Sequence, residues 1–253
     1  MSDNKAVLSL MAHPDDAEFM CAGTLVLLHK KGWDIHIGTM TSGDCGSAEL
    51  GREEISRIRR NEAAVSAKIL DGSYHCLECD DVFIMYDRQT LVKAIKLLRQ
   101  VKPAVVFAPS PSDYMVDHEI TSKVVQTACF ACGMPNIEIE GVDPFEPIPH
   151  LYYADALESV DILGNNIEPK ILVDITSVMD TKEKMLCCHE SQRNWLMVHH
   201  GMDEYVLSMK RFADDRGNKI HVKYAEGFRK HLGHGYPHDN ILRSELGDLV
   251  FER

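Results

Sequence analysis

The residues best suited to chemistry lie near the start of the chain, in the stretch Ala12-His13-Pro14-Asp15-Asp16. His13 and Asp16 are three residues apart, so their side chains can point the same way where the chain turns into a helix. An imidazole nitrogen and a carboxylate oxygen both suit Zn²⁺, and a catalytic zinc keeps three protein ligands and one open position. The pattern therefore predicts a metal site at which Asp15 remains free to contact a water molecule.

A third ligand must come from another part of the chain, and His118 is the candidate. It follows an apolar segment at 104–108 and a loop that also contains Asp113 and Asp117. These two carboxylates could orient the ligands through hydrogen bonds from outside the metal's own shell. The alternative interpretation is that His13 only occupies a turn and that the carboxylates after it only cap a helix.

The elements around these residues alternate between strand and helix patterns. Apolar and alternating segments predict strands at Ala6–Met11 and Asp34–Thr41, with a helix at 17–31 between them. Further strands are expected at 74–77, 104–108, 151–156 and 171–175, and further helices at 53–70, 88–101, 118–132 and 181–198. This order predicts an α/β fold with a Rossmann-like open, mostly parallel sheet and helices on both faces. Ligands of such sheets bind outside the carboxyl ends of the strands, where His13 and His118 are both expected.

Composition narrows the class of partner. The 253 residues carry a formal net charge of −12, and Lys and Arg are scattered, which argues against nucleic acid and suits a neutral or cationic small molecule. We see no signal peptide and no apolar run long enough for a bilayer, so we expect a cytoplasmic protein without a membrane partner. We expect a single domain over 1–253, with 133–150 as an active-site loop and 233–253 as a C-terminal tail.

Other pairs of potential ligands are weaker signals. CxxC spacing occurs at Cys76/Cys79 and at Cys129/Cys132, which could form a structural zinc ribbon, but buried reduced thiols are favoured. His199-His200 is an adjacent pair, and adjacent side chains on a helix diverge, so we expect these residues at the surface.

The sequence resembles the PIG-L/LmbE family of zinc-dependent N-acetylglucosaminyl deacetylases. The AHPDD stretch at 12–16 and the later DYxxDH stretch at 113–118 carry the resemblance, although Glu18 stands one place later than the acid of the family's AHPDDE motif. Weaker matches extend to about residue 230: Thr41-Ser42-Gly43-Asp44 to the TxGE loop, Arg59-Arg60-Asn61-Glu62-Ala63 to the RxxEA helix, His189-Glu190-Ser191-Gln192 to HxSQ, and Ala225-Glu226-Gly227-Phe228 to AExF.

The resemblance implies a metal-dependent hydrolase that removes an acyl group, typically acetyl, from an N-acylated amino sugar or its conjugate. It implies His13, Asp16 and His118 as ligands of zinc, or of another divalent transition metal, and Asp15 as the general base that activates water. The remaining predicted site residues are Arg59, Asp81 and Tyr114 near the sugar, and Asp44, Asp113 and Asp117 around the ligands.

One departure from the family bears on catalysis. The first His of the family's HPDH motif helps to stabilise the oxyanion or to protonate the leaving group, and this chain has Met115 there. Losing one oxyanion donor costs roughly a hundred- to a thousandfold in rate. We hypothesise that His234 or His238 supplies the missing group, from the same chain or from a neighbouring subunit of a homo-oligomer, with Tyr114 as a second candidate donor. The alternatives are that both histidines are only surface residues, that the protein hydrolyses a different amide, or that it binds metal and sugar without catalysis.

Overall fold

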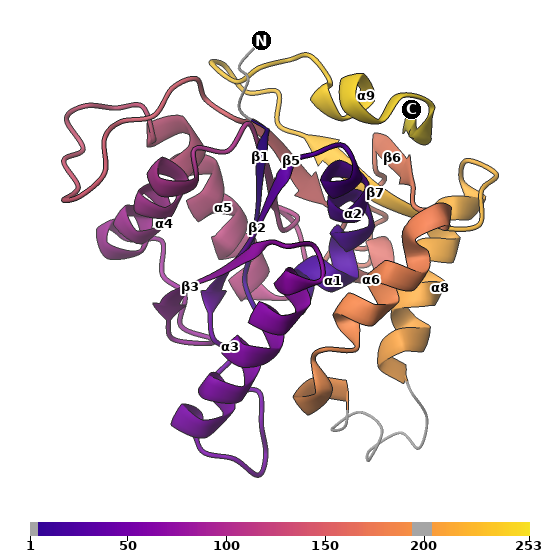
Figure 1. Cartoon of the computed structure of the whole chain (residues 1–253), viewed down its shortest axis with the longest axis horizontal. Coiled ribbons are helices and arrows are strands. Elements are labelled where there is room, and N and C mark those ends of the chain that lie inside the picture. The colour runs from indigo at the N-terminus through magenta and orange to yellow at the C-terminus, as the bar shows by residue number, and fades with distance from the viewer. Residues whose placement is uncertain (1–4, 194–203) are drawn as a thin grey trace.

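The computed structural model describes residues 5–193 and 204–253, and within them one eight-stranded sheet runs through the protein (Figure 1). Its strands, in the spatial order β3-β2-β1-β4-β5-β7-β6-β8, are β3 (Ser73–Cys79), β2 (Asp34–Thr41), β1 (Ala6–Met11), β4 (Val105–Ala108), β5 (His150–Ala154), β7 (Ala225–Lys230), β6 (Ile171–Asp174) and β8 (Val250–Glu252). The five strands from β3 to β5 are parallel, whereas β7, β6 and β8 pair antiparallel. The predicted open, mostly parallel α/β sheet is confirmed.

Helices cover both faces of this sheet because strand side chains alternate between them. Leu8 and Leu10 of β1 point into a core shared with α4 (Arg88–Val101) and α5 (Val116–Ala131), which lie to the left of the sheet in Figure 1. Val7 and Met11 point into the opposite core. The helices of that side are α1 (Asp16–Met20), α2 (Ala22–Lys30), α3 (Arg52–Lys68), α6 (Met179–Leu186), α8 (Glu204–Asn218) and α9 (Ile241–Leu246).

The helix predicted at 17–31 is divided at Cys21 into α1 and α2. The carboxylate of Glu226 on β7 accepts hydrogen bonds from the backbone N–H groups of Gly23 (2.8 Å) and Thr24 (2.7 Å), in the first turn of α2. A carboxylate at this position satisfies donors that a continuous helix would have used internally. The same carboxylate pairs with Lys182 of α6, 2.5 Å away and buried.

The carboxyl-terminal part contains more regular structure than the sequence patterns indicated. The helix expected at 181–198 ends at Leu186 as α6, and 194–198 lie outside the described residues, as does the His199-His200 pair. The expected tail 233–253 contains α9 and β8, and β8 extends the sheet by pairing with β6. No helix of the described residues is both long enough and apolar enough for a membrane crossing.

The segment 133–150, predicted as an active-site loop, lies at the amino edge of the sheet. It leads from the end of α5 into the start of β5, and the buried guanidinium of Arg99 donates to the carbonyl oxygens of Cys132, Met134 and Ile137 at 2.7–2.9 Å. Proline and glycine identified a loop here, but the edge on which it lies follows from α5, which returns the chain to the start of the next parallel strand.

Candidate metal centre and its clefts

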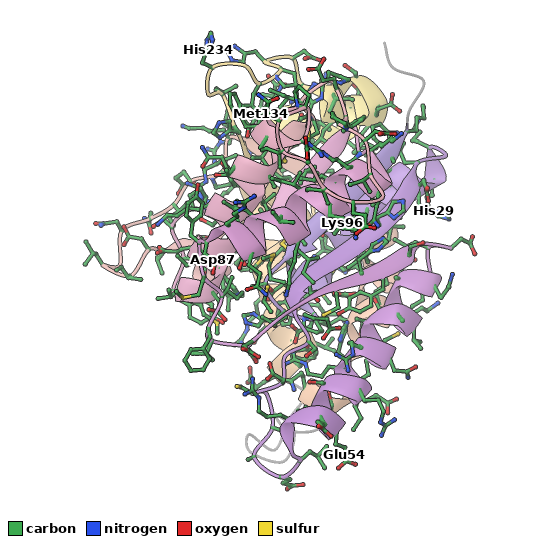
Figure 2. The ribbon with its side chains drawn as sticks, turned by 90° about the vertical axis from the view of Figure 1, so that its left-hand side faces the viewer. His29, Glu54, Asp87, Lys96, Met134 and His234 are labelled. Carbon is green, nitrogen blue, oxygen red and sulfur yellow. The ribbon has the colours of Figure 1, made fainter. Side chains whose placement is uncertain are left out.

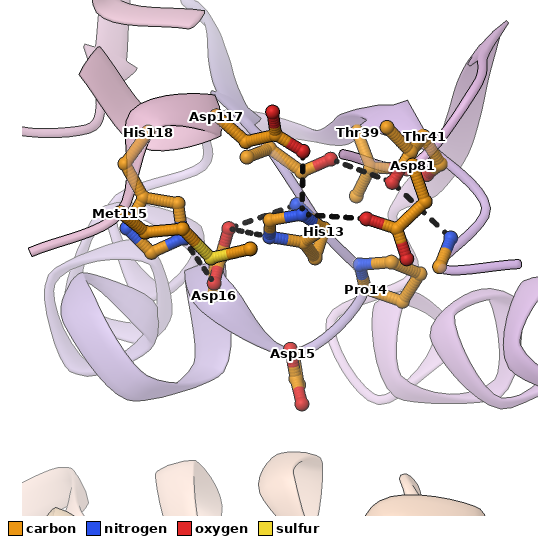
Figure 3. A network of polar contacts seen from close by, with 12 residues as sticks. His13, Pro14, Asp15, Asp16, Thr39, Thr41, Asp81, Met115, Asp117 and His118 are labelled. Atoms are coloured by element: carbon orange, nitrogen blue, oxygen red, sulfur yellow. Dashed lines mark hydrogen bonds and ion pairs between the residues drawn. The ribbon is translucent and has the colours of Figure 1, made fainter. Parts of the chain in front are cut away.

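The strand order places a crevice at the carboxyl ends of β1 and β4. The connections that leave these neighbouring strands run in opposite directions, to β2 on one side and to β5 on the other, which is where open α/β sheets bind ligands. His13 follows β1 by two residues, and His118 lies in the first turn of α5, which follows β4. Both imidazoles are buried there, with Asp16 between them (Figure 3).

The three side chains have the separations of ligands to one small cation. His13 Nδ1 lies 3.6 Å from Asp16 Oδ2, and His118 Nε2 lies 3.5 Å from Asp16 Oδ1. One ligand atom from each residue falls within 4.8 Å of the other two. In a tetrahedral zinc site, metal–ligand bonds of about 2.0–2.2 Å put two ligand atoms about 3.3 Å apart, so the donor set fits zinc in chemistry and in spacing.

The other ring nitrogen of each histidine faces a carboxylate. His118 Nδ1 lies 3.0 Å from Asp113 Oδ1, and His13 Nε2 lies 3.1 Å from Asp81 Oδ1 and 3.4 Å from Asp117 Oδ2. Such carboxylates keep a proton on one nitrogen and leave the other free for a metal. Asp113 and Asp117 thus lie where the sequence indicated, while Asp81, predicted near a sugar, also contacts a candidate ligand.

The concentration of acidic groups favours positive charge at this position. Burial by itself would lower the pKa of His118, but the carboxylates of Asp16 and Asp113 outweigh it and raise that pKa to about 10. Burial would likewise lower the pKa of His13, but the hydrogen bonds that its imidazole donates to the carboxylates of Asp117, Asp16 and Asp81 raise it instead. The field that retains protons on the imidazoles also attracts a divalent cation.

Asp15 is held away from these three residues in an unusual backbone conformation. Its φ of 101° is in the left-handed region, which costs a non-glycine residue on the order of 1–3 kcal/mol. Its Oδ2 accepts a hydrogen bond of 2.5 Å from the Tyr205 hydroxyl, and its Oδ1 lies 3.5 Å from Nη2 of Arg59. Burial raises the pKa of Asp15, and the charge of Arg59 opposes that rise. The carboxylate is therefore fixed in direction by two partners.

Arg59 also supports the turn that carries Asp15. Its Nη2 donates to the carbonyl oxygen of Pro14 at 2.7 Å and its Nη1 to that of Gly43 at 3.4 Å, while its Nε has no hydrogen-bond partner among the described residues. Gly43 has a positive φ of 69°, and a Cβ there would overlap the guanidinium. A glycine is thus required on both counts.

The weaker sequence motifs meet behind this turn. Glu62 accepts hydrogen bonds from the backbone N–H and the hydroxyl of Ser191, at 2.8 and 2.7 Å. Glu18 accepts one of 2.5 Å from Ser66 and lies 3.3 Å from Nε2 of the buried His189. These contacts pack α1, α3 and the segment after α6 against one another, so the motif residues act mainly as supports.

Two clefts open from the metal centre, and Asp15, Asp16, Tyr114 and His118 line both. The smaller, called here the polar cleft, has a volume of about 310 Å³ and is completed by His13, Cys45, Gly46, Arg59, Asp81, Val82, Met115 and Gln192. The larger, called the apolar cleft, has a volume of about 880 Å³ and is completed by Phe19, Met20, Leu157, Glu204, Tyr205, Ser208, Arg211, Phe212 and Asp215.

The remaining predicted residues fall into two groups. Asp44 accepts a 2.9 Å hydrogen bond from the backbone N–H of Asp81 and pairs with Arg52, so it supports Asp81 from behind. His234 and His238 are exposed and line neither cleft; His234 lies at the opposite end of the molecule from Glu54 of α3 (Figure 2). Within one chain, the structure does not bring these histidines to the metal centre.

Tyr205 was not identified from the sequence. It stands 190 positions after Asp15, in a helix that the patterns did not predict, and it belongs to none of the motifs. Only a signal of spatial proximity could have connected it with the general-base candidate.

Comparison with known proteins agrees with this geometry. Residues 8–129 match the family model described as PIG-L: GlcNAc-PI de-N-acetylase. Over these residues the chain is similar to the PIG-L family. The matched residues run from β1 to α5 and so contain the three candidate ligands.

Individual relatives of this chain differ in the reactions named for them. The chain is 28% identical to diacetylchitobiose deacetylase of Thermococcus kodakarensis over 238 residues, covering 90% of this chain and 84% of the relative. It is also 28% identical to 4-oxalmesaconate hydratase of Pseudomonas putida over 198 residues, 75% of each chain. Among solved structures, N,N'-diacetylchitobiose deacetylase from Pyrococcus horikoshii superimposes with a TM-score of 0.78 and 27% identity, covering 94% of this chain and 89% of that one.

Proposed function

We propose that this protein is a zinc-dependent deacetylase that cleaves the acetamide of an N-acetylated amino sugar or of its conjugate. The observation that carries the proposal is the convergence of His13, Asp16 and His118 at the crevice, each histidine with a carboxylate on its second nitrogen. The relatives named as diacetylchitobiose deacetylases support an acetylated amino sugar as the substrate class.

His13 Nδ1, Asp16 and His118 Nε2 would hold the metal, and Asp113, Asp81 and Asp117 would orient the two imidazoles. When bound, zinc supplies a Lewis acid for the amide carbonyl and lowers the pKa of a water molecule toward about 7. Two imidazoles and one carboxylate favour zinc, although another divalent transition metal can occupy such a set.

Asp15 would serve as the general base. Its carboxylate accepts a proton from the attacking water and returns that proton to the amine nitrogen as the carbon–nitrogen bond breaks, which yields acetate and a free amine. Tyr205 and Arg59 hold the carboxylate while the proton moves. The sugar would lie in the polar cleft, where Arg59, Asp81 and Tyr114 are among the lining residues and would contact its hydroxyl groups.

The group that replaces the family's histidine remains a proposal with two candidates. The Met115 thioether lines the polar cleft and cannot donate a hydrogen bond. Tyr114 lines both clefts, and its ring lies edge-on to His118 with 5.5 Å between centroids, so its hydroxyl is the candidate donor within one chain. A donor from His234 or His238 would require a second copy of the chain, so that possibility depends on the predicted homo-oligomer.

The test is product analysis. Purified protein with one equivalent of zinc is incubated with N-acetylglucosamine and with diacetylchitobiose, and acetate and primary amine are quantified in parallel. We expect both products in equal amounts and their loss after chelation. Stoichiometric zinc with sugar binding but without amide cleavage would instead favour a non-catalytic binding protein. Cleavage confined to other amides would redirect the substrate assignment. Because one relative is a 4-oxalmesaconate hydratase, hydration of 4-oxalmesaconate without any amide cleavage would contradict the proposal.

A further inference from the structure

The apolar cleft is far larger than the proposed chemistry needs. The two carbons of an acetyl group would occupy a small part of its volume of about 880 Å³, which is in the range of sites that enclose drug-sized ligands. The polar cleft, at about 310 Å³, accommodates the hydrophilic part of a substrate on the other side of the metal centre. The larger space therefore has no assigned occupant.

Aromatic and aliphatic side chains line three sides of the apolar cleft. Phe19 and Met20 of α1 form one side, Leu157 of a 3₁₀ turn (Leu157–Ser159) forms another, and Tyr205 and Phe212 of α8 form the third. The rings of Phe19 and Tyr205 meet edge to face with 5.1 Å between centroids, which holds both in place.

Three of the polar residues in the same cleft, Glu204, Ser208 and Arg211, are paired with one another. Arg211 Nη2 donates to Glu204 Oε2 at 2.8 Å and to Ser208 Oγ at 3.0 Å. Beside them, the Arg216 guanidinium stacks on the Phe212 ring at 3.3 Å and is bound to the buried Asp155 at 2.9 Å. An apolar group can therefore enter the cleft without breaking these ion pairs and hydrogen bonds. Burial of its apolar surface is then the main favourable contribution to the free energy of binding.

The apolar cleft reaches the candidate metal centre. The side chains of Asp15, Asp16, Tyr114 and His118 line it and the polar cleft alike, so a bound molecule with its amide at the metal centre extends into both. With a sugar in the polar cleft, the remainder of the substrate can reach Phe19, Leu157 and Phe212.

We propose that the preferred substrate carries an apolar group, longer than the acetyl methyl, that occupies the apolar cleft. This inference rests on the proposed function, because it takes the amide at the metal centre as its reference point. The apolar group is either the acyl chain on the nitrogen or the aglycone on the sugar, and the two share the same chemistry of recognition.

Two substrate series separate these sources. One varies the acyl chain of methyl glucosaminide from acetyl to butanoyl, hexanoyl and octanoyl, and the other varies the aglycone of N-acetylglucosaminide from methyl to butyl, hexyl and octyl. In one series we expect kcat/KM to rise roughly fourfold per methylene, up to the length that fills the cleft. Turnover of the short compounds with flat or falling kcat/KM in both series would overturn the inference and leave the proposed function standing.

A binding measurement covers the case in which no compound is turned over. Calorimetric titration of the zinc-loaded Asp15→Asn variant with the octanoyl and octyl compounds, against their acetyl and methyl counterparts, measures occupancy of the cleft without cleavage. Tighter binding of one long compound by a hundredfold or more supports the inference even if the reaction class is different. Equal binding of long and short compounds overturns it.

Substitutions in the walls of the apolar cleft test whether the preference for long substrates arises there. Phe212→Ser and Leu157→Ser should each reduce the ratio of kcat/KM for the long compound over the short one by about tenfold, because a serine replaces carbon surface in the cleft. Leu207→Ser is the matched control: Leu207 lies on the same helix as Phe212, is 45% exposed and does not line the cleft, so its ratio should stay at the wild-type value. A wall variant that lowers both rates equally, with the ratio unchanged, would show only a structural role and contradict the proposal.

Discussion

The parallel and antiparallel regions of the sheet contribute different residues to the candidate site. The parallel region, from β3 to β5, carries His13, Asp16 and His118 on two loops at its switch point. The antiparallel region, with α8 beside it, carries no ligand of that set, but it supplies the hydroxyl that holds Asp15 and one wall of the apolar cleft. The family match at 8–129 covers strands of the first region only.

This division indicates how a metal site and its substrate range can change separately. The candidate metal centre depends on two short loops and the carboxylates around them, all within residues 13–118. The cleft that would receive the variable part of a substrate depends on α8, whose contacts with Asp15 cross 190 positions of sequence. Four experiments test whether the two regions are as distinct in function as they are in structure.

Removing a ligand should have the largest effect. We expect His118→Ala to lose stoichiometric zinc and to lower deacetylation by about a thousandfold or more, because the metal contributes several kcal/mol to the barrier. Metal analysis and acetate release measure the two consequences. The control is His221→Asn at the exposed His221, which has a positive φ of 59° that asparagine tolerates. Retention of full zinc by His118→Ala would refute the ligand assignment.

Removing the base should separate proton transfer from metal binding. Asp15→Asn keeps a side chain of the same shape but cannot take a proton, so kcat should fall by about 10²–10⁴-fold while zinc content stays at the wild-type level. Single-turnover rates together with metal analysis make this measurement. Loss of zinc in this variant would place Asp15 among the ligands instead.

Removing the carboxylate that links α2 to the antiparallel region should affect stability. Glu226→Ala leaves the ammonium group of Lys182 buried without its carboxylate and removes the acceptor at the start of α2, at a cost of about 3–5 kcal/mol in the free energy of unfolding. Chemical denaturation measures this cost. Arg60→Ala, which removes an exposed pair with Glu78, should cost about 1 kcal/mol or less. Similar costs for the two variants would mean that Glu226 does not join the regions.

The smallest expected effect comes from Tyr205→Phe, which removes only one hydroxyl. A hydrogen bond to a charged group is worth about 1.5–3 kcal/mol, so kcat should fall by about ten- to a hundredfold with KM and zinc content nearly unchanged. Tyr86→Phe, at an exposed hydroxyl bonded to Thr127, is the control. A lower melting temperature with unchanged kcat would make Tyr205 structural, and the antiparallel region would then have no part in positioning the base.

Local sequence determined the parallel region and the candidate ligands that it carries. β1 and β2 begin and end where the apolar patterns predict, and His13 and His118 follow strands whose carboxyl ends must share one edge of a parallel sheet. Metal ligation needs particular residue types at the ends of such strands, so composition and spacing suffice to identify candidates. The carboxylates at 113 and 117 could be identified for the same reason, because they lie within five residues of His118.

Tertiary structure alone decided the rest. Nothing near Asp15 in sequence indicates Tyr205, nothing near Cys21 indicates that Glu226 divides the first helix, and a proline-rich loop at 133–150 does not reveal the edge of the sheet on which it lies. These features depend on contacts between residues that are far apart along the chain. The packing of whole helices determines which of these residues meet. Residue types and short spacings in the sequence indicate which chemistry a site can perform. The direction of the general-base side chain and the shape of the cleft are instead set by the helices and strands that pack around them.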